Sequence, residues 1–403
     1  MTRANRAHPP RYFLFFVASM TALAPFAIDT YLPALPTMAT ALGVDLVQMN
    51  ITMSTYMAGF AIGQLIGGPV SDQIGRRKIG GTGLLLFIAT SLLIANADSA
   101  LEIQVLRAVQ AFGGGFASVI CMAMIRDSYS AAEAAKRFPT VMLVMLSAPL
   151  VAPLIGAFLL DLGWPAIFLF LAVYAMTLLI FFGSVGETLN KPPEPMRLGG
   201  ILPQYFEVLS RRVDGKLIPL RYIFTQGLAV SVMMTFLTNS AFIYLEYFDV
   251  GEKPFALYFG ANIVVMMAFT LVTSRLIQRI PPFRLFRTGR RLQLVFVFAL
   301  AASVVLGETS LWVFTPLLAL SIGAAGLIGP SISGLYLAPF GNLSGSASSL
   351  IATASFLFGS VLGALSGLLY DGTLNPVVLT MAAAVLLANI VASTIPEPRG
   401  FVS

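Results

Sequence analysis

The chain is built from a succession of apolar runs, each about as long as a membrane is thick. A helix needs roughly 20 apolar residues to cross about 30 Å of hydrocarbon. A scan of the 403 residues with that length finds twelve such runs. The predicted spans are residues 12–36, 50–70, 79–97, 101–125, 138–160, 164–186, 222–245, 255–274, 290–307, 310–338, 345–370 and 374–395. Arg290 and Arg291 shorten the ninth run.

Composition and charge fit an integral membrane protein. Hydrophobic residues make up 57% of the chain and charged residues only 10%, far outside the balance of a soluble globular protein. The net charge of +6 could suggest a nucleic-acid partner, but the basic residues stand in short loops between apolar runs. We therefore expect no nucleic-acid binding.

Cysteine and histidine are too scarce for several kinds of chemistry. Cys121 and His8 are each the single residue of their type, so one chain cannot assemble a disulfide framework, a zinc site or an iron-sulfur cluster. His8 stands in the polar amino-terminal tail, which excludes catalysis by a serine-histidine or cysteine-histidine pair. We expect no enzyme activity and no metal, and we expect Cys121 to pack in a helix.

The positions of lysine and arginine test the number of spans. If the amino terminus is cytoplasmic, these residues should fall in alternate loops. They do so in the amino tail and near residues 76–78, 126, 136–137, 191–221, 275–291 and 399, while Lys253 alone lies outside and Arg107 alone lies within a span. With one span more or one fewer, the lysines and arginines would no longer fall in alternate loops. We expect a multi-pass protein with both termini in the cytoplasm.

The first apolar run follows three arginines and could be taken for a secretory signal. Ala22-Leu23-Ala24 resembles a cleavage site, but Pro25 directly after it argues against cleavage. The apolar stretch also continues to about Leu35, which is too long for a signal core. We interpret this run as the first span.

A polar connection at residues 187–221 divides the spans six and six. Its second part, from Ile201 to Leu209, spaces apolar residues as a helix does and precedes two arginines, which predicts a short amphipathic helix on the cytoplasmic surface. The plainer reading, an ordinary linker, is compatible with this one. The predicted fold is an all-α polytopic membrane protein, with pseudo-symmetric six-helix bundles at 1–186 and 222–403 and a binding site between them at mid-membrane.

Asp29 is the decisive acid, because it lies sixteen residues beyond Phe13, about 24 Å along an ideal helix. A charged side chain within a span costs at least about 2.5 to 3.5 kcal/mol, so such a residue by default faces a cavity and serves function. Its carboxyl group is a candidate for proton uptake and release. The alternative is an acid at a frayed helix end near the outer interface.

Arg107 is the predicted partner of Asp29. It lies about two turns into a span that begins outside near Leu101, at a depth comparable to that of Asp29. Opposite charges at similar depth can pair, and protonation of the acid would free the cation for an anionic or polar substrate group. A purely structural bond to helix carbonyls is the alternative.

The stretch Gly68-Pro69-Val70-Ser71-Asp72-Gln73-Ile74-Gly75-Arg76-Arg77-Lys78 joins two spans and predicts a tight cytoplasmic hairpin. Asp72 with Arg76, and Arg126 with Asp127 at the inner end of the fourth span, are candidate charge pairs. Together these residues could form a network that latches the inner face shut.

Two further patterns concern helix packing and a cavity. Pro149 and Pro153, followed by Gly156, predict a bend or a tightly packed seam in the fifth span. Gly359, Gly363 and Gly367 repeat small residues at four-residue spacing in the eleventh span. Such residues more often serve packing than gating.

Candidate cavity-lining residues, each of which could equally be packing, are Phe26, Tyr56, Phe236, Asn239, Tyr244, Phe356 and Phe358.

Several of these motifs together carry a family resemblance. Residues 68–78 resemble the loop between the second and third helices of the major facilitator superfamily, and residues 107–113 resemble its arginine motif. Residues 148–156 are similar to its antiporter motif of proline and glycine. Residues 29–36 and Arg126-Asp127 resemble the bicyclomycin and chloramphenicol resistance branch of the twelve-span drug:proton antiporters.

The resemblance implies a monomeric exporter in the bacterial inner membrane. Its two bundles would rock to give alternating access, with the proton gradient as energy source and without a cofactor. It further implies that Asp29 is the protonation and substrate site, that Arg107 is its coupling partner, and that Asp72, Arg76 and Asp127 form the inner latch. Small-molecule substrate, protons and membrane lipid are the expected partners.

The carboxyl-terminal half matches the family less well. Residues 241–246 and 345–349 fit the same branch, but the second copy of the hairpin loop, near residues 274–289, lacks its acid. Trp164-Pro165 stands where the branch usually has tryptophan followed by arginine. These departures weaken what the resemblance implies about the substrate and the latch, but they do not change the fold that it implies.

The leading hypothesis is a proton-coupled exporter of small, largely apolar compounds. A dedicated exporter of one metabolite, such as a siderophore or a sugar, is the nearest alternative, and an uptake symporter is disfavoured by the antiporter-type motif. A membrane enzyme would need clustered catalytic groups, and a receptor or scaffold would need an extended soluble domain. The sequence contains neither.

Overall fold

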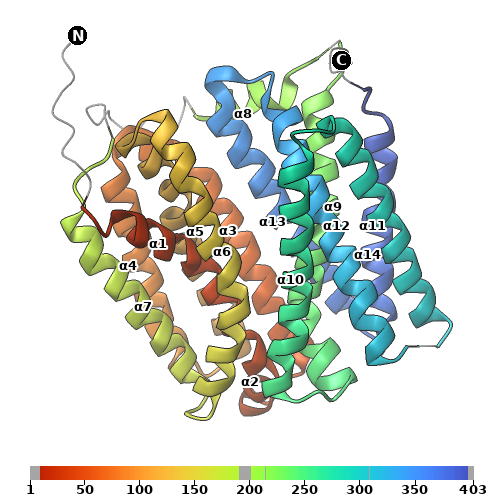
Figure 1. Ribbon diagram of the computed structural model, residues 1–403. Helices are drawn as coiled ribbons and strands as arrows, with labels where there is room; N and C mark the ends of the chain where they lie inside the picture. Colours follow the sequence, from red (N-terminus) through yellow and green to blue (C-terminus); the bar gives the residue numbers. More distant parts are fainter. Residues whose placement is uncertain (1–9, 190–200, 214, 308, 398–403) are drawn as a thin grey trace, which may run out of the picture. The chain divides into compact units, whose positions relative to one another are not determined.

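The computed structural model of the chain describes residues 10–189, 201–213, 215–307 and 309–397 (Figure 1). His8, the linker prolines Pro192, Pro193 and Pro195, and Arg399 lie outside these described residues. Within them the chain is built from α-helices joined by short turns. The elements are α1 (Phe13–Asp29), η1 (Leu32–Ala34), α2 (Leu35–Leu42), α3 (Leu46–Ile74), α4 (Arg76–Ile94), α5 (Ala100–Ser128), α6 (Ala131–Leu160), α7 (Pro165–Ser184), α8 (Ile201–Ser210), α9 (Ile218–Ala241), the π-helix η3 (Phe242–Tyr247), α10 (Glu252–Leu276), α11 (Pro282–Val305), α12 (Leu311–Leu337), η4 (Gly341–Leu343), α13 (Ser344–Leu368) and α14 (Asn375–Ser393).

Local sequence accounts for where many helices begin. Ser130 and Glu133 form a reciprocal capping box at the start of α6, and the Ser99 side chain accepts a hydrogen bond from the Glu102 backbone amide at the start of α5. Proline occupies the first or second position of α7, α9, α11 and α14, where its missing amide hydrogen costs no helix bond. Pro165, a departure from the family pattern, therefore has a plain role as the first residue of α7.

Each predicted span coincides with helical structure, but two expectations need correction. The first span is not continuous, because α1 ends at Asp29 and a 3-10 turn separates it from α2. The ninth span begins earlier than predicted, because α11 starts at Pro282 and includes Arg290. The long arginine stem reaches a polar partner there, since the Arg290 Nη1 atom donates to Asn389 Oδ1 at 3.0 Å.

Eleven helical segments among the described residues are long and apolar enough to cross a membrane, counting α1 to α2 and α9 to η3 as single segments. The remaining predicted span is α3, a helix of 29 residues that polar side chains such as Asn50 and Gln64 make less apolar. The protein is an all-α polytopic membrane protein.

The chain forms two compact units. The first contains Met1–Ala34 and Ala58–Ile201, and the second contains Leu35–Met57 and Leu202–Ser403. Within each unit, the long helices run side by side in Figure 1. The boundaries predicted at residues 187 and 221 stay a prediction.

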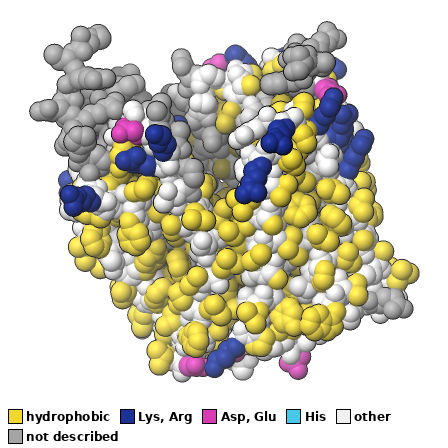
Figure 2. Space-filling model, in the orientation of Figure 1, with side chains coloured by type: hydrophobic (Ala, Val, Ile, Leu, Met, Phe, Trp, Pro, Cys, Tyr) yellow, Lys and Arg dark blue, Asp and Glu magenta, His cyan; other side chains and the backbone are white. Residues whose placement is uncertain are grey.

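Charged side chains lie mainly near the ends of the helices. On the visible surface of each unit, hydrophobic side chains cover the middle, and lysine and arginine gather towards one end (Figure 2). In the first unit this end carries the start of α4 and the end of α5, with Arg76 and Arg126. In the second unit it carries the end of α10 and the start of α11, with Arg275 and Arg284. This distribution agrees with the alternation in the sequence.

Glycine allows close helix contacts in both units. A Cβ atom on Gly63 of α3 would overlap the carbonyl oxygen of Phe112 in α5, and one on Gly113 of α5 would lie 2.6 Å from the Gly83 oxygen in α4. In the second unit, a Cβ atom on Gly363 of α13 would lie 2.6 Å from Thr238 Oγ1 in α9. Small residues let helix backbones approach closely, which is a main source of packing energy inside a membrane.

Cys121 packs inside α5, as expected. Its side chain is fully buried, and its Sγ atom lies 3.3 Å from the Ala117 carbonyl oxygen. The thiol therefore belongs to the helix interior of the first unit.

Substitution of two glycines should separate close packing from helix propensity. Gly63→Ala should destabilise the protein by about 1–3 kcal/mol, because the added methyl group overlaps the α5 backbone. Gly81→Ala, where nothing lies within 4 Å of the added atom, should stabilise it by about 0.5–1 kcal/mol. Thermal unfolding of the purified proteins measures both changes, and equal shifts for the two variants would contradict the packing assignment.

Candidate functional site

The candidate site is centred on the carboxyl-terminal end of α1. Asp29 is the last residue of this helix and is only 3% exposed. Thr30 folds back on the same turn, where its backbone amide and its hydroxyl both donate to the Phe26 carbonyl oxygen, the hydroxyl at 2.6 Å. The acid thus stands at a helix end, as one reading of the sequence supposed, but this end is buried.

Arg107 approaches the same helix end from α5. Its side chain is fully buried, and its Nη1 atom donates to the Ala27 carbonyl oxygen at 3.1 Å and to Gln110 Oε1 at 2.8 Å. The last four carbonyl groups of a helix lack intrahelical partners and carry partial negative charge, so a cation is stabilised there. The sequence left open that Arg107 makes a purely structural bond to helix carbonyls. Such a bond is present, and its acceptor, Ala27, lies two residues before Asp29. The coupling of Arg107 to Asp29 stays a prediction.

A chain of buried hydrogen bonds continues from Arg107 into α4. The Gln110 Nε2 atom donates to Ser91 Oγ at 2.7 Å, and the Ser91 hydroxyl donates to the Phe87 carbonyl oxygen at 2.6 Å. Gln110 and Ser91 are fully buried. Because buried polar groups are costly without partners, this series of hydrogen bonds fixes the orientation of the Gln110 side chain and, through it, of the Arg107 guanidinium group.

Aromatic rings cover the guanidinium group. The Arg107 Cζ atom lies 4.6 Å from the ring centre of Tyr31 and 6.0 Å from that of Phe168 in α7. The Tyr31 and Phe168 rings also contact each other, with centres 5.5 Å apart. Cation–π contacts within about 6 Å stabilise a buried cation. Tyr31 and Phe168 were not among the predicted site residues, although Tyr31 lies only two positions after Asp29.

Gly156 brings α6 against the same end of α1. A Cβ atom at this position would overlap the carbonyl oxygen of Thr30, the residue that follows Asp29. Pro149 and Pro153 lie in the same helix, which runs without interruption from Ala131 to Leu160. The predicted antiporter motif therefore supplies a tight backbone contact next to the acid.

The predicted substrate-binding residues fall into both units. In the first unit, Phe26 is half-buried and its ring centre lies 5.3 Å from that of Tyr174. The members in the second unit, which are buried or half-buried, are Tyr56, Phe236, Asn239, Tyr244, Phe356 and Phe358. Their joint role in one pocket stays a prediction.

The second unit holds a neutral polar cluster where α9 passes into the π-helix η3. The Asn262 Nδ2 atom of α10 donates to the Tyr244 hydroxyl oxygen at 3.3 Å, and the Tyr244 hydroxyl lies 3.4 Å from Thr315 Oγ1 in α12. Nearby in α9, Asn239 donates to Ser366 Oγ at 2.9 Å. Hydrogen bonds thus join η3 to α10 and α12, and α9 to α13. Helical turns of the π type are frequent at functional sites.

The carboxyl-terminal end of η3 is tied to the loop after α13. The Tyr370 hydroxyl donates to Glu246 Oε1 at 3.0 Å. Burial, together with the charge of Glu246, raises the pKa of Tyr370 to about 12. The hydroxyl therefore keeps its proton and can donate at any physiological pH.

The predicted inner network forms around Arg76. This side chain is 8% exposed, pairs with Asp72, and donates through Nε to Asp127 Oδ2 at 3.1 Å and through Nη1 to Ser71 Oγ at 2.7 Å. Arg126 is exposed on the last turn of α5. One guanidinium group therefore joins the end of α3, the start of α4 and the end of α5.

The turn between α3 and α4 explains the glycines of the hairpin. Gly75 has a φ angle of 111°, which only glycine adopts readily, and it is the single residue between the two helices. Glu187, which was not predicted, accepts hydrogen bonds from the backbone amides of Arg76 and Arg77 at 3.0 and 3.1 Å. Gly68 lies nearly two turns before the end of α3, and a Cβ atom added there would lie 3.4 Å from Val119 Cγ2 of α5, an ordinary contact.

Comparisons with known proteins agree with this architecture. The family model described as Major Facilitator Superfamily matches residues 17–364. The chain is 28% identical over 388 residues to a bicyclomycin resistance protein homolog of Haemophilus influenzae, covering 93% of this chain and 94% of the relative. It is 25% identical to the multidrug resistance protein MdtL of Klebsiella pneumoniae, with 96% of each chain covered. It is also 39% identical to a chloramphenicol resistance protein of Pseudomonas aeruginosa, over 38% of this chain and 36% of that protein.

Solved structures share the fold. The crystal structure of a D-xylose-proton symporter matches with a TM-score of 0.74 and 16% identity, covering 96% of this chain and 99% of that one. The similarity to the resistance proteins confirms the branch predicted from residues 29–36 and 126–127. The family match spans most of the chain, and the chain therefore belongs to the major facilitator superfamily of membrane transporters.

Proposed function

We propose that the protein is a proton-coupled antiporter that exports small, largely apolar compounds by alternating access. The observation that carries this proposal is the burial of the Asp29 carboxyl group at the broken end of α1, beside the hydrogen-bonded Arg107. A charged side chain inside a membrane protein is costly, so an acid at this position is by default functional. A change of its charge during the transport cycle would be that function.

Proton and cargo would compete for the end of α1. With Asp29 ionised, its charge offsets that of Arg107 and the site attracts a proton or a polar group of the cargo. With Asp29 protonated, the carboxyl group becomes neutral, while Arg107 retains dipolar partners that include Ala27 and Gln110. Because one group cannot hold proton and cargo equally well, binding of either one would displace the other.

The membrane potential supplies enough energy for this exchange. Each charge that crosses 100 mV is worth about 2.3 kcal/mol, which corresponds to roughly a 50-fold concentration ratio. No resident cofactor is needed under this proposal, and one chain would complete the cycle as a monomer.

The names of the relatives support a drug-like cargo. They are described as bicyclomycin, chloramphenicol and multidrug resistance proteins. The cation-rich ends of both units support an orientation in the bacterial inner membrane with the termini in the cytoplasm. Under this orientation the Arg76 network holds the inner ends of α3 and α5 together while cargo leaves on the outer side, and it opens when the site faces the cytoplasm.

Replacement of the acid should abolish coupling. Asp29→Asn removes the ionisable group but keeps its shape, so proton-driven transport of chloramphenicol or bicyclomycin into inside-out vesicles should fall to the level of empty vesicles. Asp29→Glu should retain part of the activity. Asp98→Asn, which alters an exposed acid in the loop before α5, should transport like the unaltered protein.

The amount of each variant in the membrane serves as the control for folding. Proton-driven transport by Asp29→Asn at the unaltered rate, with normal protein levels, would exclude Asp29 as the coupling group. Loss of transport in Asp98→Asn as well would show that the assay responds to any loss of negative charge.

Replacement of Arg76 should loosen the inner ends of the helices. Arg76→Lys keeps the charge but not the fork that reaches Asp127 and Ser71 together, so it should cost about 1–3 kcal/mol of stability. Lys78→Ala, at an exposed position on the same first turn of α4, should change stability by less than about 0.5 kcal/mol. Thermal unfolding and the rate of thiol labelling of a cysteine placed at Ser128 would report the change. Equal behaviour of Arg76→Lys and Lys78→Ala would contradict the network.

A further inference from the structure

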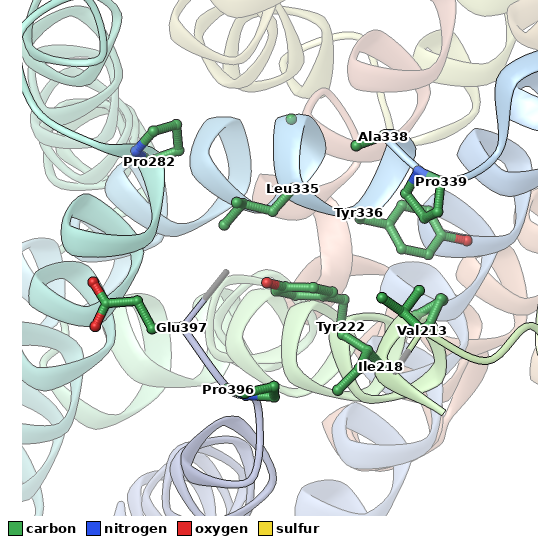
Figure 3. A pocket seen from close by; sticks show the side chains of 12 residues that line it. Val213, Ile218, Tyr222, Pro282, Leu335, Tyr336, Ala338, Pro339, Pro396 and Glu397 are labelled. Carbon is green, nitrogen blue, oxygen red and sulfur yellow. The ribbon is translucent and has the colours of Figure 1, made fainter. Parts of the chain in front are cut away.

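The second unit contains an apolar pocket at its cation-rich end, apart from the Asp29 site. Its volume is about 490 Å³, within the range of pockets that hold small molecules. It lies among the start of α9, the start of α11, the end of α12 and the segment after α14 (Figure 3). The residues that line this pocket, here called the tyrosine pocket, are Val213, Ile218, Pro219, Tyr222, Pro282, Gly334, Leu335, Tyr336, Ala338, Pro339, Pro396 and Glu397.

The lining of the tyrosine pocket is mainly apolar and can contact a hydrocarbon chain. Most of its members are aliphatic residues or prolines, and two are tyrosines. Tyr336 presents mainly its ring, because its hydroxyl donates to the Ala347 carbonyl oxygen at 3.0 Å. The Tyr222 hydroxyl points into the pocket towards Glu397 (Figure 3). The pocket therefore offers a large apolar surface with polar groups at one side.

The rim of the tyrosine pocket is cationic. Arg221 donates to the Thr394 carbonyl oxygen at 2.5 Å, and Arg211 donates to the Pro339 carbonyl oxygen at 3.4 Å. Arg287 lies 3.8 Å from the Glu397 carboxylate and offsets its charge, and both side chains are more than one-third exposed. Glu207 lies 3.4 Å from Arg211 and offsets its charge. Lys216, in the segment before α9, and Arg284, on α11, are exposed. Positive charge thus exceeds negative charge around the opening.

The neighbouring helix α8 also presents apolar side chains. Leu202 and Phe206 are each 72% exposed on one face, whereas Tyr205 and Val208 are buried against the unit. Exposed apolar side chains beside cations are typical of helices that lie in the headgroup region of a bilayer. The pocket is therefore placed where the end of a lipid molecule can reach it.

We propose that the tyrosine pocket binds an anionic phospholipid of the cytoplasmic leaflet. The phosphate lies at Arg221 and Arg287, and the glycerol backbone and the upper part of an acyl chain enter the apolar lining. A soluble anion would use only the rim, and a neutral lipid would use only the lining. Anionic lipid matches both, and the cytoplasmic leaflet is rich in it. This inference rests on the proposed orientation but not on proton coupling or on the cargo.

The test uses the purified full-length protein in a neutral detergent. Dioctanoyl-phosphatidylglycerol is the probe, dioctanoyl-phosphatidylcholine controls for the tails, and glycerol 3-phosphate controls for the charge. Native mass spectrometry counts bound lipid, and thermal unfolding follows stabilisation by a ligand that binds the folded state. Only phosphatidylglycerol should give a saturable complex and a raised Tm.

Two kinds of variant assign binding to the pocket. Gly334→Leu should fill it without a clash, because nothing lies within 4 Å of an added Cβ atom, and Gly81→Leu is the matched control on α4. Arg221→Gln and Arg287→Gln should each weaken phosphatidylglycerol binding about fivefold, as expected for a cation near an anionic surface. The control Arg275→Gln changes an exposed arginine at the end of α10 that does not line the pocket.

The outcomes separate the possibilities. Equal binding of phosphatidylglycerol and phosphatidylcholine, or an equal effect of glycerol 3-phosphate, would overturn the proposal. So would Gly334→Leu binding like Gly81→Leu, or Arg221→Gln and Arg287→Gln binding like Arg275→Gln. Asp29→Asn should keep the full lipid response, so failure of the antiport mechanism and failure of the lipid site are distinct results.

Discussion

A guanidinium group that is fully withdrawn from water must find acceptors inside the protein, and the broken end of α1 provides them. The terminal turn of α1 has carbonyl groups without helical partners, and Arg107 has donors without water. The bond from Arg107 to the Ala27 carbonyl oxygen brings one such donor and one such acceptor together. The surrounding helices are arranged about this contact. Helix α4 joins it through Gln110 and Ser91, and α7 through Phe168.

The two units share irregular helix ends and close glycine contacts, but their buried polar groups differ in charge. In each, the first long helix ends irregularly, α1 before a 3-10 turn and α9 in a π-helix. In each, a glycine brings another helix against this one: Gly156 of α6 in the first unit and Gly363 of α13 in the second. The buried charges, however, belong to Asp29 and Arg107 in the first unit, while the corresponding region of the second unit holds the neutral Tyr244 cluster. Under the proposed function, the first unit would exchange protons, and the second would offer hydrogen bonds to the cargo.

Much of this arrangement could be predicted from the sequence. Apolar length and the alternation of cations identified the spans, because both follow directly from the thickness and the polarity of a bilayer. The hairpin at Gly75 and the pairing of Asp72 with Arg76 followed from local spacing. These features depend on short stretches of chain, which a sequence displays in full.

The features that escaped prediction depend on contacts between distant segments. The end of α1 at Asp29 was only one of two readings of the sequence, because Asp29 lies inside an apolar run and hydropathy does not mark a helix end there. The role of Glu187 depends on a contact with the start of α4, more than 100 residues away. The start of α11 was misjudged because Arg290 was counted as a loop residue, whereas Asn389 of α14 gives it a partner within the helix bundle. Sequence spacing along one helix cannot reveal such partners.

The burial of Cys121 has a practical consequence for measuring conformational change. A thiol packed inside α5 is a poor target for maleimide and nitroxide reagents, which require an accessible thiolate. New cysteines introduced at exposed helix ends can therefore carry spectroscopic probes while the native residue stays in place. Distances between pairs of such probes would then follow the transport cycle in a protein whose interior packing is unaltered.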